Sequence, residues 1–232
     1  SRGLGDVYKR QVIYFASVFL FSYLVGSFNF AYLVARIKNI DIRNEGSGNP
    51  GTSNIHRVLG RKMAIFVLFG DILKGISMPY WVLPSAAYFI NSLYNVNDYG
   101  YMDNLVEAWE IGIHVAGFAV VFGHCYPIYY KFRGGKGVAS FIGYLLFLFY
   151  YYQLSFLWIL SLLALYYAVF RSTKTAALAS LAVVFTSVFI LFSIVSHSAD
   201  PGLVLFISTV FLIFWRHKEN FQRLMRGEEN KF

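Results

Sequence analysis

Seven apolar segments separated by short polar loops constrain the fold of this 232-residue chain more than any other feature. The core of a bilayer holds no water to satisfy backbone N–H and C=O groups, so spanning segments form helices or closed barrels. One helical crossing needs about 17–25 mostly apolar residues. We therefore predict an all-α integral membrane protein with seven short transmembrane helices. The segments cover residues 12–35, 63–90, 108–128, 137–152, 154–170, 175–195 and 201–215.

The apolar stretch of residues 138–170 decides how many helices are expected. It is interrupted only by Gln153 and Ser155, and it is too long for one crossing. As a single helix it would put Arg171 on the opposite side from the basic loop at 131–136, against the positive-inside rule. We therefore predict a hairpin of two short helices, each about 24 Å long at 1.5 Å per residue.

The distribution of charge predicts the orientation. Sixteen of the 20 Lys and Arg residues lie in segments 36–62, 131–136, 171–174 and 216–231, whereas the alternate loops hold acidic residues and no basic ones. This asymmetry predicts a cytoplasmic C-terminus and an N-terminus outside. The net charge of +8 therefore reflects membrane topology, and nucleic-acid binding is not expected.

The ends and the cysteine content give further expectations. Residues 1–11 are polar and lack an apolar stripe, so we expect a non-native or disordered tail there, followed by one membrane-embedded domain at 12–232. No repeat divides that domain. Cys125 is the single cysteine, which excludes an intrachain disulfide and a metal site built from cysteines.

The first basic loop contains a glycine-rich segment at residues 45–57. Its backbone could curl around an anion such as phosphate, with the Ser47 hydroxyl and the Arg57 guanidinium as further ligands. A G-x-G-x-x-G pattern is present, with Asp71 twenty residues beyond its last glycine, but a dinucleotide site needs flanking strands that are absent here. A flexible polar turn remains the alternative. The candidate ligands are Gly46, Ser47, Gly48, Asn49, Gly51, Asn54 and Arg57.

A second candidate segment precedes the predicted helix at 137–152. It joins the cations Arg133 and Lys136 through two glycines, Gly134 and Gly135, where a helix N-terminus would favour an anion. An ordinary basic loop is an equally good interpretation. We expect His124 to hydrogen-bond this loop rather than donate a proton.

Two further sets of polar residues have helical spacing. Asp71 and Lys74 lie one turn apart within an apolar segment and could form an ion pair. In the C-terminal tail, His217 and Asn220 would share one face of a helix. A histidine can move a proton or bind phosphate, although an interfacial residue is the simpler interpretation.

Three ordered motifs resemble those of the bacterial acyl-phosphate:glycerol-3-phosphate acyltransferases. The family pattern G-S-G-N-x-G-A-T-N-x-x-R is similar to residues 46–57, with Thr52 and Ser53 in place of Ala and Thr. The pattern G-H-x-x-P followed by F-K-G-G-K-G-V-A-T is similar to residues 123–140, and H-R-E-N-I-x-R-L-L-x-G-x-E to residues 217–229. The outer segment at 91–110 is longer than is usual in this family.

The resemblance implies an enzyme with seven short helices in the bacterial cytoplasmic (inner) membrane, its active site facing the cytoplasm. It implies transfer of a fatty acyl group from acyl phosphate to the 1-hydroxyl of glycerol 3-phosphate. Neither a metal nor a cofactor is expected, and we expect a monomer in the lipid bilayer. An anion transporter and a non-catalytic scaffold are the rival classes. The catalytic residues would be Ser47, Arg57, Lys136, His217 and Asn220, and the phosphate-binding residues Gly46, Gly48, Asn49, Gly51, Asn54, Arg133, Gly134, Gly135 and Glu229.

Overall fold

The computed structural model describes residues 4–93, 101–193 and 201–229, and its regular structure within these ranges is entirely helical. Two short 3-10 turns, Ile42–Asn44 and Ile128–Tyr130, lie between the longer helices. The α-helices are α1 (Leu4–Ser27), α2 (Phe30–Ile37), α3 (Thr52–Leu59), α4 (Arg61–Leu93), α5 (Tyr101–Cys125), α6 (Val138–Tyr151), α7 (Phe156–Thr173), α8 (Ala176–Phe192), α9 (Pro201–Arg216) and α10 (Lys218–Met225).

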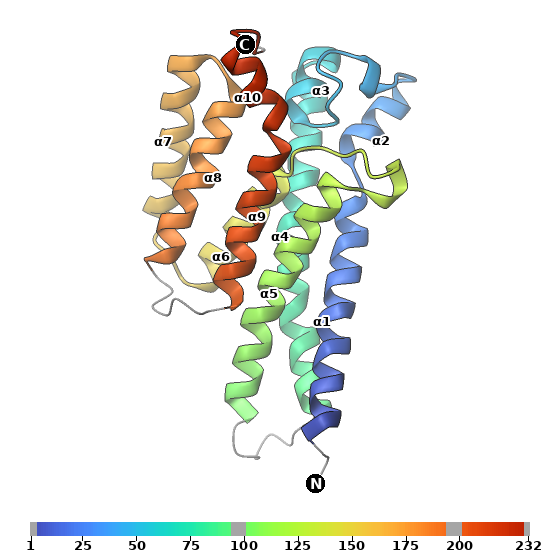
Figure 1. Ribbon diagram of the computed structural model, residues 1–232, viewed down its shortest axis with the longest axis vertical. Coiled ribbons are helices and arrows are strands. Elements are labelled where there is room, and N and C mark those ends of the chain that lie inside the picture. Colours follow the sequence, from blue (N-terminus) through green and yellow to red (C-terminus); the bar gives the residue numbers. More distant parts are fainter. Residues whose placement is uncertain (1–3, 94–100, 194–200, 230–232) are drawn as a thin grey trace.

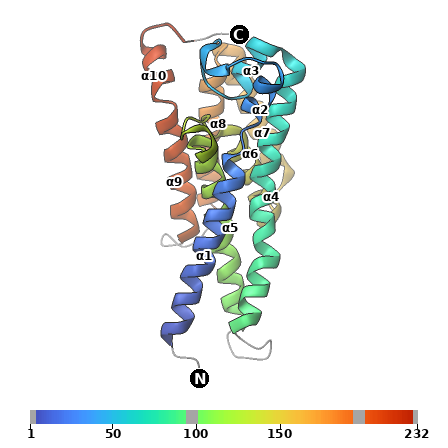
Figure 2. The same ribbon diagram turned by 90° about the vertical axis from the view of Figure 1, so that its right-hand side faces the viewer.

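The long helices α1, α4 and α5 run side by side and extend beyond the others toward the N-terminal end (Figures 1 and 2). Helix α6 packs against α4 and α5, and α9 also packs against α5, whereas α7 contacts chiefly α8 at the edge of the bundle. The short helices α3 and α10 lie at the end opposite the N-terminus (Figure 1). All three motif-bearing segments therefore meet at one end of the helical bundle.

Among the residues that the structure describes, four helical segments are long and apolar enough to cross a membrane: Lys9–Ile37, Arg61–Ser92, Asp103–Tyr130 and Phe156–Thr173. Three shorter apolar helices correspond to α6, α8 and α9. The expected division of residues 138–170 into two helices is confirmed, because α6 and α7 are separate, with the Ser155 hydroxyl accepting a hydrogen bond from the Leu157 amide at 3.3 Å. The number of seven membrane crossings stays a prediction.

The N-terminal region differs from expectation in two ways. Helix α1 begins at Leu4, so residues 4–11 are helical and not a disordered tail; long side chains such as those of Lys9, Arg10 and Gln11 favour a helix. The single helix expected at 12–35 is also broken, because α1 ends at Ser27 and α2 begins at Phe30. Asn29 caps α2 by accepting a hydrogen bond from the Tyr32 amide at 3.1 Å.

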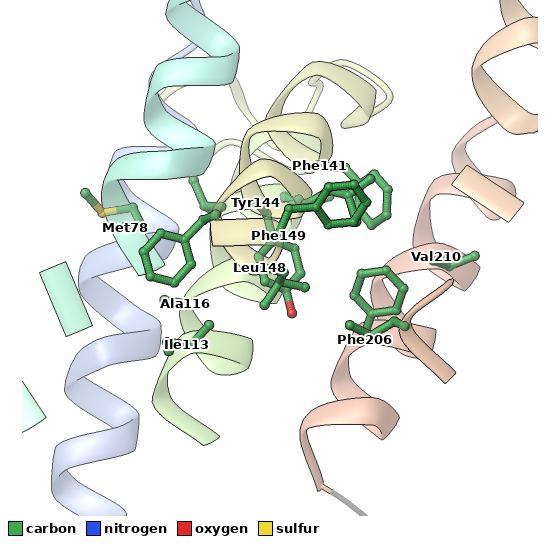
Figure 3. Packing of buried hydrophobic residues seen from close by; sticks show 14 of the residues in the cluster. Met78, Ile113, Ala116, Phe141, Tyr144, Leu148, Phe149, Phe206 and Val210 are labelled. Atoms are coloured by element: carbon green, nitrogen blue, oxygen red, sulfur yellow. The ribbon is translucent and has the colours of Figure 1, made fainter. Parts of the chain in front are cut away.

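Aromatic side chains of α6 fill the centre of the bundle. Phe141, Tyr144 and Leu148 are fully buried. The Phe141 ring lies 5.5 Å from the Phe206 ring of α9, centroid to centroid (Figure 3). Burial of rings this size dominates packing energetics. Helix α6, which follows directly on the second basic loop, is therefore held firmly in the core.

Helices α4 and α6 cross at a pair of glycines. A Cβ atom on Gly143 would collide with the carbonyl oxygen of Ile72, and one on Gly75 would collide with that of Ser140. Small residues permit such close backbone approach where helices pack within a membrane.

We expect Gly143→Ala to lower the free energy of unfolding by about 1–3 kcal/mol, because overpacking forces the two helices apart. Thermal denaturation in detergent measures the effect. Leu163→Ala on α7, where the side chain is 60% exposed, is the matched control and should unfold close to wild type. A Gly143→Ala protein that is as stable as the control contradicts the close crossing.

Candidate active site

The glycine loop, residues 45–51, is shaped by the side chain of Asn54. Gly46 and Gly48 have positive φ angles of 57° and 70°, which glycine adopts without strain. The buried Asn54 side chain accepts a hydrogen bond from the Ser47 amide at 2.8 Å and donates one to the Glu45 carbonyl at 2.9 Å. Asn54 thus braces the loop from inside instead of facing a ligand.

Hydrogen bonds within the loop reduce the number of backbone amides that could bind an anion. The amide of Gly48 donates to the Glu45 carbonyl at 3.0 Å, and that of Gly51 to the Asn49 carbonyl at 2.9 Å. These groups, like the Ser47 amide, are committed to the loop itself. The amides of Thr52 and Ser53 open α3, where the first N–H groups of a helix have no partner within it. An anion would find its backbone donors there and its charged ligand one turn further on, at Arg57.

The second loop, residues 133–137, packs tightly against the end of α5. The Gly135 amide donates to the His124 carbonyl at 3.1 Å, as expected for a loop bonded to His124. A Cβ on Gly134 would collide with that same carbonyl, and one on Gly135 would lie 3.1 Å from the carbonyl oxygen of Pro50. Only glycine fits at both positions. The second loop therefore lies directly beside the glycine loop.

Arg216 holds the second loop through hydrogen bonds to its backbone carbonyls. Its Nη2 donates to the Gly134 carbonyl at 2.9 Å and its Nε to the Gly135 carbonyl at 3.2 Å, while the guanidinium lies 5.0 Å from the centroid of the Tyr126 ring. This role of Arg216 was not predicted, because in the sequence Arg216 is only one of several basic residues beside the membrane. Its position next to His217, at the end of an apolar segment, was the available signal.

The tail joins the second loop through Asn220. The Asn220 side-chain oxygen accepts a hydrogen bond from Lys136 Nζ, and its amide nitrogen donates to Glu229 Oε1 at 2.7 Å. Glu229 also accepts from Arg223 Nε at 3.0 Å. Both ends of the Asn220 amide are occupied, and Glu229 faces cations. The two residues therefore hold Lys136 in place, and a carboxylate at this position would repel a phosphate if it contacted one directly.

Burial and neighbouring charges lower the pKa values of both Lys136 and His217. Burial first, and then the charge of Arg223, lower the pKa of Lys136 to about 8, although Glu229 acts in the opposite direction. Burial and the charge of Lys136 lower the pKa of His217 to about 4. His217 is neutral at pH 7, and its Nδ1 lies 2.8 Å from the Ile213 carbonyl, so Nδ1 carries the proton and Nε2 can accept one.

Arg57 connects the first loop to the tail electrostatically. Partial burial lowers the pKa of its guanidinium, and the nearby Glu229 opposes that shift.

The predicted pairing of Asp71 with Lys74 is also present, at 2.9 Å. In contrast, the Arg133 side chain is exposed, and the backbone carbonyl of that residue accepts a hydrogen bond from the Tyr32 hydroxyl at 2.8 Å. No cluster of His, Cys, Asp and Glu within the described part of the chain could hold a metal ion.

Comparison with known proteins decides the family. A family model described as glycerol-3-phosphate acyltransferase matches residues 16–227. The chain belongs to the glycerol-3-phosphate acyltransferase family. The family resemblance of the three motifs is thereby confirmed, and the protein is an integral membrane acyltransferase of phospholipid synthesis.

Relatives of this acyltransferase match it along almost its whole length. The glycerol-3-phosphate acyltransferase of Aquifex aeolicus is 34% identical over 215 residues, covering 92% of this chain and 96% of the relative. That of Shouchella clausii is 37% identical over 224 residues, covering 95% and 97%. The crystal structure of PlsY (YgiH), an integral membrane glycerol 3-phosphate acyltransferase in its glycerol 3-phosphate form, has a TM-score of 0.73 and 30% identity, covering 94% of this chain and 95% of that one. Its lysophosphatidic acid form has a TM-score of 0.69.

We expect the reactivity of Lys136 toward an amine-selective acylating reagent to rise with a midpoint near pH 8. Glu229→Gln should lower this midpoint, since it removes the negative charge that favours the ammonium. Arg223→Gln should raise it, because it removes a competing cation. Mass spectrometry of labelled peptides gives the midpoints, with the exposed Lys131 as an internal reference for the reagent. A midpoint that is the same in all three proteins contradicts the described electrostatics.

Proposed function

We propose that this protein transfers a fatty acyl group from acyl phosphate to the 1-hydroxyl of sn-glycerol 3-phosphate, giving lysophosphatidic acid and inorganic phosphate. The observation that carries the proposal is the convergence of Lys136, Arg57 and the two glycine-containing loops at one end of the bundle. Both proposed substrates are phosphate anions, and relatives are named for glycerol 3-phosphate. Apolar helices adjoining the site suit a substrate that carries an acyl chain.

The reaction needs two phosphates close together. In our proposal Arg57 and the start of α3 bind one of them, while Lys136 and the second loop bind the other. Fixed cations in a partly desolvated site stabilise the negative charge that develops on the carbonyl oxygen and on the departing phosphate. Holding donor and acceptor in register lowers the barrier further. Asn220 and Glu229 contribute by positioning Lys136.

We favour direct attack by the glycerol hydroxyl. Its oxygen bonds to the acyl carbonyl carbon, the bond from that carbon to the phosphate oxygen breaks, and the hydroxyl proton passes to an oxygen of a substrate phosphate. The neutral His217 can orient the acceptor by accepting, at Nε2, a hydrogen bond from the second hydroxyl of glycerol 3-phosphate, which does not react. An acyl intermediate on Ser47 is the competing route, which trapping of acylated protein in a single turnover would reveal.

The setting of the site completes the proposal. We infer that the end bearing α3 and α10 faces the cytoplasm of a bacterium, because basic residues concentrate in its loops. The protein would act as a monomer in the inner membrane, with seven crossings and without a metal or cofactor. Residues 12–232 would form its one catalytic domain.

The decisive experiment compares donors and variants in one assay. Purified protein with acyl phosphate and glycerol 3-phosphate should yield lysophosphatidic acid, whereas acyl-CoA should not serve as donor. Arg57→Ala and Lys136→Ala should each reduce kcat/KM by roughly a hundredfold or more, because charge stabilisation of the transition state is lost. Lys131→Ala, an exposed cation of the same loop region, is the matched control and should retain activity. Near-normal rates in both site variants would sink the assignment, and turnover with acyl-CoA alone would overturn the donor.

A further inference from the structure

Three ionisable side chains outside the proposed substrate contacts form a buried cluster behind the second loop. Asp71, Lys74 and His124 are exposed by only 1%, 5% and 3%. Lys74 Nζ lies 2.9 Å from Asp71 Oδ1 and 3.0 Å from His124 Nδ1, and His124 Nδ1 lies 3.4 Å from Asp71 Oδ1. Charges within apolar helices are costly, so their presence calls for a functional explanation.

Lys74 anchors the break between α1 and α2. Its ammonium donates to the Gly26 carbonyl at 3.0 Å and to the Phe28 carbonyl at 2.8 Å. These carbonyls lie at the end of α1, where a helix leaves its last acceptors without partners. From the same break, Asn29 Nδ2 donates to the Pro50 carbonyl at 3.2 Å. The cluster is thus linked to the end of the glycine loop.

His124 links the ion pair to the second loop. Its Nδ1 edge faces Lys74 and Asp71, while a Cβ on Gly135 would collide with its Nε2. The imidazole therefore fills the space between the buried charges and the backbone of Gly135. Because an ammonium can only donate, Nδ1 is the acceptor in this contact and the ring proton resides on Nε2, toward the loop.

We propose that Asp71, Lys74 and His124 are positioning residues: the ion pair fixes the imidazole ring, and the ring fixes the second loop in the shape that presents Lys136 and its neighbouring backbone to a phosphate. This inference rests on the proposed function of that loop. Lys74 fixes the break between α1 and α2, from which Asn29 bonds to Pro50 of the glycine loop, whereas His124 supports the second loop. The cluster therefore sets the spacing between the two loops. A displacement of about 1 Å in such a site can cost roughly a hundredfold in rate.

The test separates positioning from simple stabilisation. Lys74→Met leaves the Asp71 charge buried and unpaired, so this variant should unfold at a clearly lower temperature than wild type. In Asp71→Asn/Lys74→Met the unpaired charge is gone, so this double variant should unfold at a higher temperature than Lys74→Met. We nevertheless expect its KM for glycerol 3-phosphate to stay roughly a hundredfold above wild type. The stabilisation of the folded protein by added glycerol 3-phosphate should also be lost.

Two further variants test the role of the imidazole ring without disturbing the ion pair. His124→Gln retains a hydrogen-bonding side chain but loses the ring that supports Gly135, and it should show the same rise in KM without leaving a buried charge unpaired. Ser187→Ala removes a buried hydroxyl of α8 that donates to the Val184 carbonyl of the same helix, and it should match wild type in KM. Recovery of KM together with stability in the double variant, or a normal KM in His124→Gln, overturns the inference. A wild-type protein without acyl transfer and without ligand-dependent stabilisation contradicts the proposed function instead.

Discussion

Backbone carbonyls that have no donor within a helix, at the end of α1 and in the second loop, must find donors elsewhere, and this requirement organises the motif-bearing end of the molecule. Each set is satisfied by a side chain from a distant segment. Lys74 of α4 donates hydrogen bonds to the carbonyls of Gly26 and Phe28, and Arg216 donates to those of Gly134 and Gly135. The loops that carry the candidate site are therefore fixed by tertiary contacts, although their sequences are rich in glycine.

The same contacts produce the electrostatic character of the site. Arg57, Lys136 and Arg223 gather around one carboxylate, Glu229, so positive charge is in excess. Burial removes water from the Lys136 ammonium and, together with the charge of Arg223, lowers the pKa of Lys136 to about 8. A bound phosphate would relieve this excess. In the proposed function, this excess of positive charge favours the binding of a substrate phosphate.

Sequence alone predicted those features that depend on periodicity or on charge near the membrane. The positions of Arg171 and Lys174 predicted that residues 138–170 divide into two helices, as α6 and α7 do. The spacing of His217 and Asn220 predicted that they share one face of the tail, and both side chains are buried. The hydrogen bonds of Asn54 to the glycine loop and of Arg216 to the second loop could not be predicted. Those roles depend on which carbonyls remain open after folding. The break after α1 was missed for a related reason, because Lys74 supports it from 46 residues away along the chain.

The central claim is that segments far apart in the sequence form one site, and a double-mutant cycle between Arg57 and Asn220 tests it most directly. Arg57→Ala, Asn220→Ala and the double variant would be compared by kcat/KM for acyl transfer to glycerol 3-phosphate. If Arg57 and Asn220 act on one substrate assembly through Glu229 and Lys136, their effects should couple by about 1 kcal/mol or more. Effects that add to within about 0.3 kcal/mol would show two independent sites and contradict the account.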